Sequence, residues 1–162
     1  MSFTPDQLKT AVHVPPGAGP SRWVFGDRYT LKSGLHNTGP AFGLVEAVVP
    51  AGGGPPKHVH YHEDELFYVI DGRLELFTGE EAVIAEPGAF IYVPRGVTHS
   101  FTNAFTDDCR MLLMFLPAGK ERFFLEMGVS ADDGAPPPPP EQYAIDRENA
   151  IRLAPKYGER YV

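Results

Sequence analysis

The chain has 162 residues, of which 43% are hydrophobic and 22% charged, the proportions of a soluble globular protein with one core. Its formal net charge of −7 and its lack of a Lys/Arg cluster argue against a nucleic-acid partner. No apolar run reaches the length of a membrane span, no signal peptide opens the sequence, and the single cysteine cannot form an intrachain disulfide. We therefore expect a cytoplasmic protein with no membrane partner.

The amino-terminal residues predict an arm followed by a first pair of strands. Residues 2–10 suit a short helix, which the proline- and glycine-rich stretch 15–20 ends. From Trp23 onward the pattern is strand-like, and the Gly26-Asp27 pair predicts a tight turn between two strands. The barrel is therefore expected to begin near residue 22.

Short strands separated by Gly/Pro turns continue to Leu116. The Asp71-Gly72 pair predicts a two-residue hairpin, with residues 73–77 as the returning strand. Roughly nine strands recur at a spacing typical of sandwiches and barrels, with ranges 23–25, 29–32, 42–49, 58–71, 73–77, 82–85, 89–93, 99–103 and 110–116. The sequence therefore predicts an all-β fold, an antiparallel double-sheet jelly-roll barrel.

The character of the sequence changes after Pro117. Residues 119–128 predict a short helix that ends at a glycine, and residues 141–153 predict a second helix. Between them, residues 135–140 indicate a polyproline II segment, which suits a stiff connector or a ligand of a proline-binding domain. We expect a single domain over residues 1–162, with the barrel core at about 22–117 and a helical extension at about 118–162.

Four side chains in the barrel region carry the chemistry. His58 and His60 are two residues apart, so on a strand both imidazoles face the same side. Glu65 has the opposite parity and reaches that side only if a bulge or corner interrupts residues 61–64. His99 follows a Pro-Arg-Gly turn and can approach from a neighbouring strand. Imidazole and carboxylate ligands suit one divalent transition metal ion, namely Ni, Co, Fe, Mn, Cu or Zn.

Other polar residues nearby are expected to have lesser roles. His62 is expected to be exposed or to support a ligand, and Glu63 and Asp64 are expected to be solvated turn acids. Cys109 is expected to be a buried strand residue, since only the adjacent Arg110 is placed to lower its pKa.

An apolar pocket is expected beside the four ligand candidates. Strand alternation from Glu65 and His99 directs aromatic side chains inward, where they form either ordinary core or a pocket for a flat ring. The helix at 119–128 follows the last barrel strand, so its two adjacent phenylalanines are placed to close over a substrate. The candidate pocket residues are Phe67, Phe101, Met111, Phe123 and Phe124.

Two stretches of the sequence resemble the paired motifs of the cupin superfamily. The first motif, G-x5-H-x-H-x4-E-x6-G, is matched by Gly52, His58, His60, Glu65 and Gly72. The second motif, G-x5-P-x-G-x2-H-x3-N, is matched by Gly88, Pro94, Gly96, His99 and Asn103. The resemblance implies a small cupin barrel in which His58, His60, Glu65 and His99 hold the metal.

A narrower resemblance is to bacterial quercetinase-like cupins, carried by residues 54–60, 63–69, 94–99 and the later Pro117-Ala118-Gly119 and Phe123-Phe124. It implies oxidative cleavage of a flavonol or similar aromatic enol with O2, with Glu65 also acting as the base that takes the enol proton. Two alternatives stay open: a metal-dependent cyclase or isomerase of a polyketide-like or small carbonyl substrate, and a non-catalytic binding module. A homodimer is also expected, because strand edges need covering.

Overall fold

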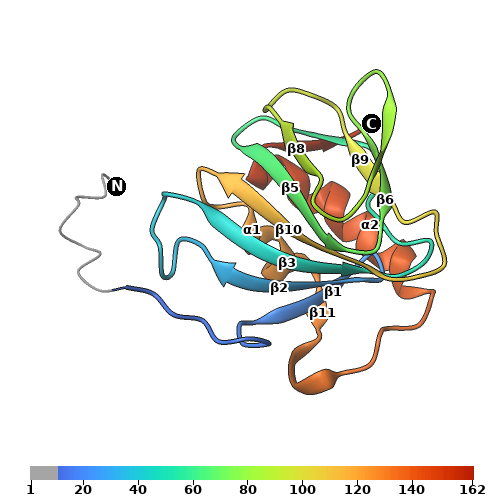
Figure 1. Ribbon diagram of the computed structural model, residues 1–162. Helices are drawn as coiled ribbons and strands as arrows, with labels where there is room; N and C mark the ends of the chain where they lie inside the picture. The colour runs from blue at the N-terminus through green and yellow to red at the C-terminus, as the bar shows by residue number, and fades with distance from the viewer. Residues whose placement is uncertain (1–10) are drawn as a thin grey trace.

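The computed structural model describes residues 11–162, whose three antiparallel sheets form the two layers of a jelly-roll barrel (Figure 1). This confirms the all-β architecture predicted from the sequence. The helix expected at residues 2–10 lies outside the described residues. In the part of the chain that is described, no helix is both long and apolar enough to cross a membrane.

Ten strands precede the first helix, one more than expected, because the stretch 58–71 divides into two strands. The barrel strands are β1 (Ser21–Val24), β2 (Asp27–Ser33), β3 (Gly43–Val49), β4 (His58–His60), β5 (Asp64–Asp71), β6 (Leu74–Phe77), β7 (Ala82–Ala85), β8 (Phe90–Val93), β9 (Ser100–Thr102) and β10 (Cys109–Leu116). The later elements are α1 (Glu121–Met127), β11 (Val129–Ser130), the 3-10 helix η2 (Asp132–Gly134), α2 (Gln142–Leu153), the 3-10 helix η3 (Ala154–Tyr157) and β12 (Glu159–Tyr161).

The larger sheet has the order β11-β1-β2-β3-β10-β5-β8 and runs across the front of Figure 1, with both α-helices behind it. Its central strands alternate strictly between core and outer face, as β-branched and aromatic strands with one buried side do. On β10 the inward residues are Cys109, Met111, Leu113 and Phe115. Cys109 is therefore a core residue, as predicted.

The second layer consists of β7-β6-β9 and β12-β4. These two groups of strands meet at one antiparallel bridge, where the backbone N–H of His58 donates to the carbonyl of His99 at 3.0 Å and the reverse bond measures 2.9 Å. Two of the candidate ligands are thus cross-strand neighbours, an arrangement that places their side chains close together.

The predicted hairpin at Asp71-Gly72 is wrong. The chain does turn there, but β5 pairs with β8 and β10, whereas β6 pairs with β7 and β9 in the other layer. Gly72 adopts φ 70°, and a Cβ on it would lie 2.3 Å from the carbonyl oxygen of Asp108. The turn sequence specifies the local reversal, while burial of Leu74 and Leu76 carries β6 across to the second layer.

The carboxy-terminal segment passes behind the barrel and returns to it. Both predicted helices are confirmed as α1 and α2. Glu121 of α1 is fully buried and accepts hydrogen bonds from the backbone N–H groups of Leu35 and Gly119, at 3.0 and 2.7 Å, which fixes the helix against the barrel. Beyond α2, β12 pairs with β4, a strand that the sequence did not reveal.

Candidate metal centre

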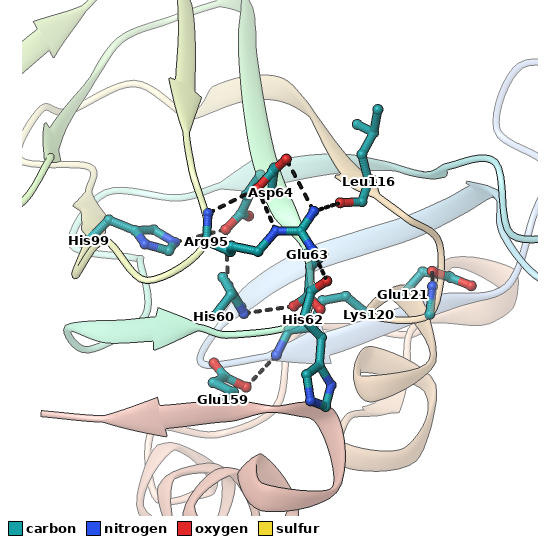
Figure 2. Close-up of polar contacts among 12 residues, drawn as sticks. His60, His62, Glu63, Asp64, Arg95, His99, Leu116, Lys120, Glu121 and Glu159 are labelled. Atoms are coloured by element: carbon teal, nitrogen blue, oxygen red, sulfur yellow. Dashed lines mark hydrogen bonds and ion pairs between the residues drawn. The ribbon is translucent and has the colours of Figure 1, made fainter.

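The corner between β4 and β5 brings Glu65 to the same side as the histidines. β4 ends at His60 and β5 begins at Asp64, so the alternation is interrupted where the ligand hypothesis required it. Arg95 holds this corner, because its guanidinium donates to the Asp64 carboxylate at 2.9 Å and to the carbonyl of His62 at 3.0 Å (Figure 2). From Asp64 onward the strand is regular, and Glu65, Phe67 and Val69 face inward.

The four candidate ligands lie together and are buried. His58, His60, Glu65 and His99 each offer one ligand atom, and these atoms all lie within 4.8 Å of one another. Oε2 of Glu65 is 2.8 Å from Nε2 of His99 and 3.1 Å from Nε2 of His60. Three imidazoles and one carboxylate therefore converge from β4, from β5 and from the residue that precedes β9.

The outer nitrogens of the three imidazoles are each occupied by an acceptor. Nδ1 of His58 donates to the carbonyl of Pro56 at 2.8 Å, and Nδ1 of His99 donates to the carbonyl of Val97 at 3.0 Å. Nδ1 of His60 lies 2.9 Å from Oε1 of Glu63. An acceptor beside each Nδ1 favours the proton on that nitrogen, so Nε2 of each neutral imidazole is the atom that can bind a metal; in this structure Nε2 of His60 and of His99 contacts Oε2 of Glu65. The residues present thus fit a divalent first-row metal.

Glu63 is not the solvated turn acid that we expected. It is only 4% exposed, and its Oε1 atom faces Nδ1 of His60 in a protein interior (Figure 2). The corner at residues 61–64 turns this carboxylate inward. A straight strand would have pointed both Glu63 and Glu65 to the face opposite His58 and His60. Asp64 is half-buried and paired with Arg95 rather than free. His62 is exposed, as predicted.

Burial and close contacts within the cluster together shift the pKa values of its side chains. Burial opposes protonation of His60, but its contacts with Glu63 and Glu65 outweigh that effect and raise its pKa to about 9. Burial and the neighbouring His99 and His60 lower the pKa of His58 to about 3. Burial disfavours the carboxylate form of Glu65, yet hydrogen bonds from His60 and His99 hold its pKa well below the usual range. Metal binding must therefore displace a proton from His60.

A small cavity adjoins the ligand cluster. Its volume is about 30 Å³, close to the space of a single water molecule. Of the five candidate pocket residues, Phe101, Phe123 and Phe124 line it, whereas Phe67 and Met111 lie in the surrounding core. Phe67 instead packs edge-on against the rings of His99 and Phe101, at centroid distances of 6.2 and 6.0 Å.

Several cavity residues carried no sequence signal. Lys120 and Glu159 form a buried ion pair beside the ligands, and Tyr161 follows on β12 (Figure 2). Phe25 and Tyr29, from the first hairpin, also line the cavity, and the ring centroid of Phe25 lies 6.4 Å from that of Tyr161. Phe25 adopts φ 54° and its backbone N–H donates to Asp146 of α2 at 2.8 Å. No local motif marks these residues, because segments far apart in sequence bring them together.

Comparisons with known proteins agree with this geometry. The family profile "Cupin domain" matches residues 45–115, the stretch that contains all four candidate ligands. Among solved structures, KdgF from a Halomonas species superposes with a TM-score of 0.62 at 18% identity, over 70% of this chain and 99% of that one. Residues 45–115 therefore form a cupin domain. Both motifs read from its sequence thus lie where the cupin fold places them.

Two further similarities bear on what this cupin does. Quercetin 2,3-dioxygenase of Bacillus subtilis is 25% identical over 150 residues, which is 87% of this chain and 44% of that protein. The chain spans about half the length of the curated relatives it matches. The polyketide cyclase RemF from Streptomyces resistomycificus has a TM-score of 0.59 at 21% identity, over 65% of this chain and 79% of that one, a likeness of fold alone.

Proposed function

We propose that this cupin is a metal-dependent dioxygenase of the quercetinase-like type, which cleaves a flavonol or similar aromatic enol with O2. The observation that carries the proposal is the convergence of three Nε2 atoms and one carboxylate beside an aromatic-lined cavity. The similarity to quercetin 2,3-dioxygenase over most of the chain supports the same reaction class.

His58, His60, Glu65 and His99 would hold the ion. A bound divalent metal would polarise a substrate oxygen and activate dioxygen. The chain's own residues fix the ligand geometry, since the bonds of Nδ1 to Pro56 and Val97 orient two of the rings.

Glu65 would act as the general base. Its Oε2 atom meets His60 and His99, which leaves Oε1 as the oxygen placed to take the enol proton. The site excludes water, because Phe101, Phe123 and Phe124 wall the cavity. Those rings offer the apolar faces against which a flat substrate stacks. The cavity is too small for a flavonol as it stands, so entry requires outward displacement of the segments that cover it.

The test combines metal analysis with oxygen consumption. Protein as purified should contain about one divalent transition metal ion per chain and should consume O2 with a flavonol or a smaller enediol. Glu65→Gln should lower the turnover number by at least about a hundredfold while part of the metal is retained. The matched control is Glu75→Gln, a change at an exposed glutamate of β6. Metal-loaded protein that consumes no O2 with a broad panel of enols would contradict the dioxygenase proposal.

One observation favours a second candidate, a cyclase or isomerase. The Lys120 ammonium lies in the cavity wall, where it can polarise a carbonyl oxygen without any need for O2. Turnover of a polyketide-like or small carbonyl substrate under strictly anaerobic conditions would identify this activity. Metal and ligand binding with no turnover in either atmosphere would instead indicate a binding module.

We further propose that the protein forms a homodimer through the outer face of the larger sheet. Tyr68 and Phe90 are cross-strand partners there, and Leu66 pairs with Tyr92 beside them. Tyr68, Phe90 and Tyr92 are about half exposed, an unusual density of aromatic surface on one sheet edge. Phe90→Glu should convert a dimer to a monomer in light scattering without loss of metal. A wild-type monomer at high micromolar concentration would contradict this proposal.

A further inference from the structure

Two opposite charges are buried in the wall of the metal cavity. The side chains of Lys120 and Glu159 are 3% and 2% exposed, and they form an ion pair with each other. Lys120 comes from the residue before α1, and Glu159 from the first position of β12, so the pair joins two segments far apart in sequence. Both residues line the cavity together with His58, His60 and Glu65, and Figure 2 shows the pair beside His60.

A structural role alone explains this pair poorly. Removing two charges from water costs several kcal/mol, and a buried ion pair often stabilises a fold no better than apolar residues of similar size. The cavity wall around the pair is aromatic, so apolar packing was available there: the Lys120 ammonium lies 3.8 Å from the ring centroid of Phe123. The presence of a buried ion pair here therefore calls for an explanation other than stability of the fold.

The Lys120 ammonium has donors to spare. It carries three N–H bonds, and among the described residues its one hydrogen-bond acceptor is Glu159. Glu159 is held on this lysine inside a cavity that three of the candidate metal ligands, His58, His60 and Glu65, also line, together with Tyr29 and Tyr161.

Glu159 also lies in a wall that the cavity shares with an outer groove. Glu159 and Tyr161 line both the inner cavity and an outer groove of about 300 Å³, a volume typical of a small-molecule site. β12 is three residues long and has a single strand partner, β4. Displacement of this short strand would connect the groove to the ligands and would free Lys120 at the same time.

We propose that Lys120 binds an anionic oxygen of the substrate, and that Glu159 occupies this anion site when the cavity is closed. The substrate class is an enol or enediol that carries a carboxylate or a second acidic oxygen. An entering anion would replace one carboxylate by another, so the ammonium never loses its counter-charge and the exchange avoids the cost of an unpaired buried cation. The choice of substrate rests on the proposed function, whereas the anion site itself does not.

The test compares two chelating probes that differ by one carboxylate. Acetohydroxamate and succinate monohydroxamate are titrated calorimetrically into Co²⁺-loaded protein, and metal content is measured first. The wild type should bind the carboxylated probe about tenfold more tightly than the neutral one. Lys120→Met should remove this preference, and Lys120→Arg should restore at least part of it. The control is Lys156→Met, a change at a lysine whose side chain is 59% exposed.

Glu159→Gln distinguishes an anion site from a structural ion pair, because the two halves of the pair should act in opposite directions. Removing the resident carboxylate should increase the affinity for the carboxylated probe about tenfold and leave the affinity for the neutral probe unchanged. A structural pair predicts instead that Lys120→Met and Glu159→Gln weaken both probes alike, and that result would overturn the proposal. So would a wild type that does not prefer the carboxylated probe.

A second arm separates this proposal from the proposed function. Metal-free protein titrated with succinate monohydroxamate should show weaker binding that still depends on Lys120 and is still strengthened by Glu159→Gln. Failure to bind Co²⁺ would overturn the metal-dependent function and leave this arm to decide on the anion site. If Lys120→Met does not change the affinity of the metal-free protein for succinate monohydroxamate, the proposed anion site is wrong.

Discussion

The cavity has two halves that are built in different ways. In the ligand half, the acceptors that orient the imidazoles are two or three residues away in sequence: Pro56 from His58, Val97 from His99, and Glu63 from His60. In the cover half, which consists of residues 120–124 and 159–161, the contacts span long separations. Lys120 and Glu159 are 39 residues apart, and Glu121 and Leu35 are 86 apart.

This difference separates two properties of the site. Local hydrogen bonds orient the ligands of the first half, so the capacity to bind metal depends on short stretches of chain. Packing of remote segments holds the second half, so the shape and charge of the substrate space depend on tertiary structure. Substitutions in the ligand half should therefore change metal affinity with little effect on stability, and substitutions in the cover should do the opposite.

The largest effect is expected from removal of a ligand. His99→Ala should reduce bound metal from about one ion per chain to below roughly a tenth, because the remaining donors leave one coordination position open to water. The unfolding midpoint measured with a chelator present should change little. The check is elemental analysis paired with urea denaturation; full metal occupancy in this variant would show that His99 is not a ligand.

The next largest effect should come from the cover. Phe123 is 2% exposed and packs on Phe124 and Tyr157, so Phe123→Ala should lower the free energy of unfolding by about 3 kcal/mol through lost burial and a new cavity. Metal content should stay at the wild-type level. Ile145→Ala on α2 is the control, since that side chain is 51% exposed and lies outside both the cavity and the proposed dimer face. Loss of metal in Phe123→Ala would show that the cover half also determines metal binding, which contradicts the separation of the two properties.

A smaller effect is expected at Glu63. Glu63→Gln removes the carboxylate that faces Nδ1 of His60, so metal affinity should fall by about 10- to 100-fold while folding is preserved. Glu75→Gln, a change at an exposed glutamate of β6, should leave metal affinity unchanged. Competition with a fluorescent chelator measures the metal affinity of both variants. Equal metal affinities would show that Glu63 does not support metal binding.

The smallest effect concerns Asp27, which lies beneath the cavity and accepts a hydrogen bond from Tyr29 at 2.9 Å. Burial raises the pKa of this carboxyl from 3.8 to about 8. The folded protein thus keeps a proton that the unfolded chain releases, so its contribution to stability is complete below about pH 4 and is lost as the pH rises toward 8.

Asp27→Asn should abolish that pH dependence. Between pH 5 and pH 8, the stability of the wild type relative to this variant should fall by at least about 1 kcal/mol, measured by urea unfolding. A difference that is constant across this range, or one that grows with pH, would contradict a protonated Asp27.

The sequence predicted most of what is local. Strand alternation and turn residues predicted the barrel and a reversal at Gly26-Asp27, which the structure places one residue earlier, between Val24 and Asp27. Helix-ending residues predicted both helices, and the two motifs predicted the candidate ligand set. The failures share one cause. Asp71-Gly72 specifies a reversal but not the sheet in which the next strand pairs, and Glu63 turns inward only because Arg95, which is remote in sequence, holds the corner beside it.

By itself, the sequence determined that three histidines and one glutamate could share a strand-rich site, because their spacing and the turns between them are short-range properties. Only the tertiary structure decided what surrounds that site. Lys120, Glu159 and Tyr161 meet the ligands through a helix start and a last strand that no periodicity connects, and their charge and burial arise from packing across the whole barrel. Short motifs in the sequence thus identify the candidate ligands, whereas the residues that set the selectivity of the site are found only from the tertiary structure.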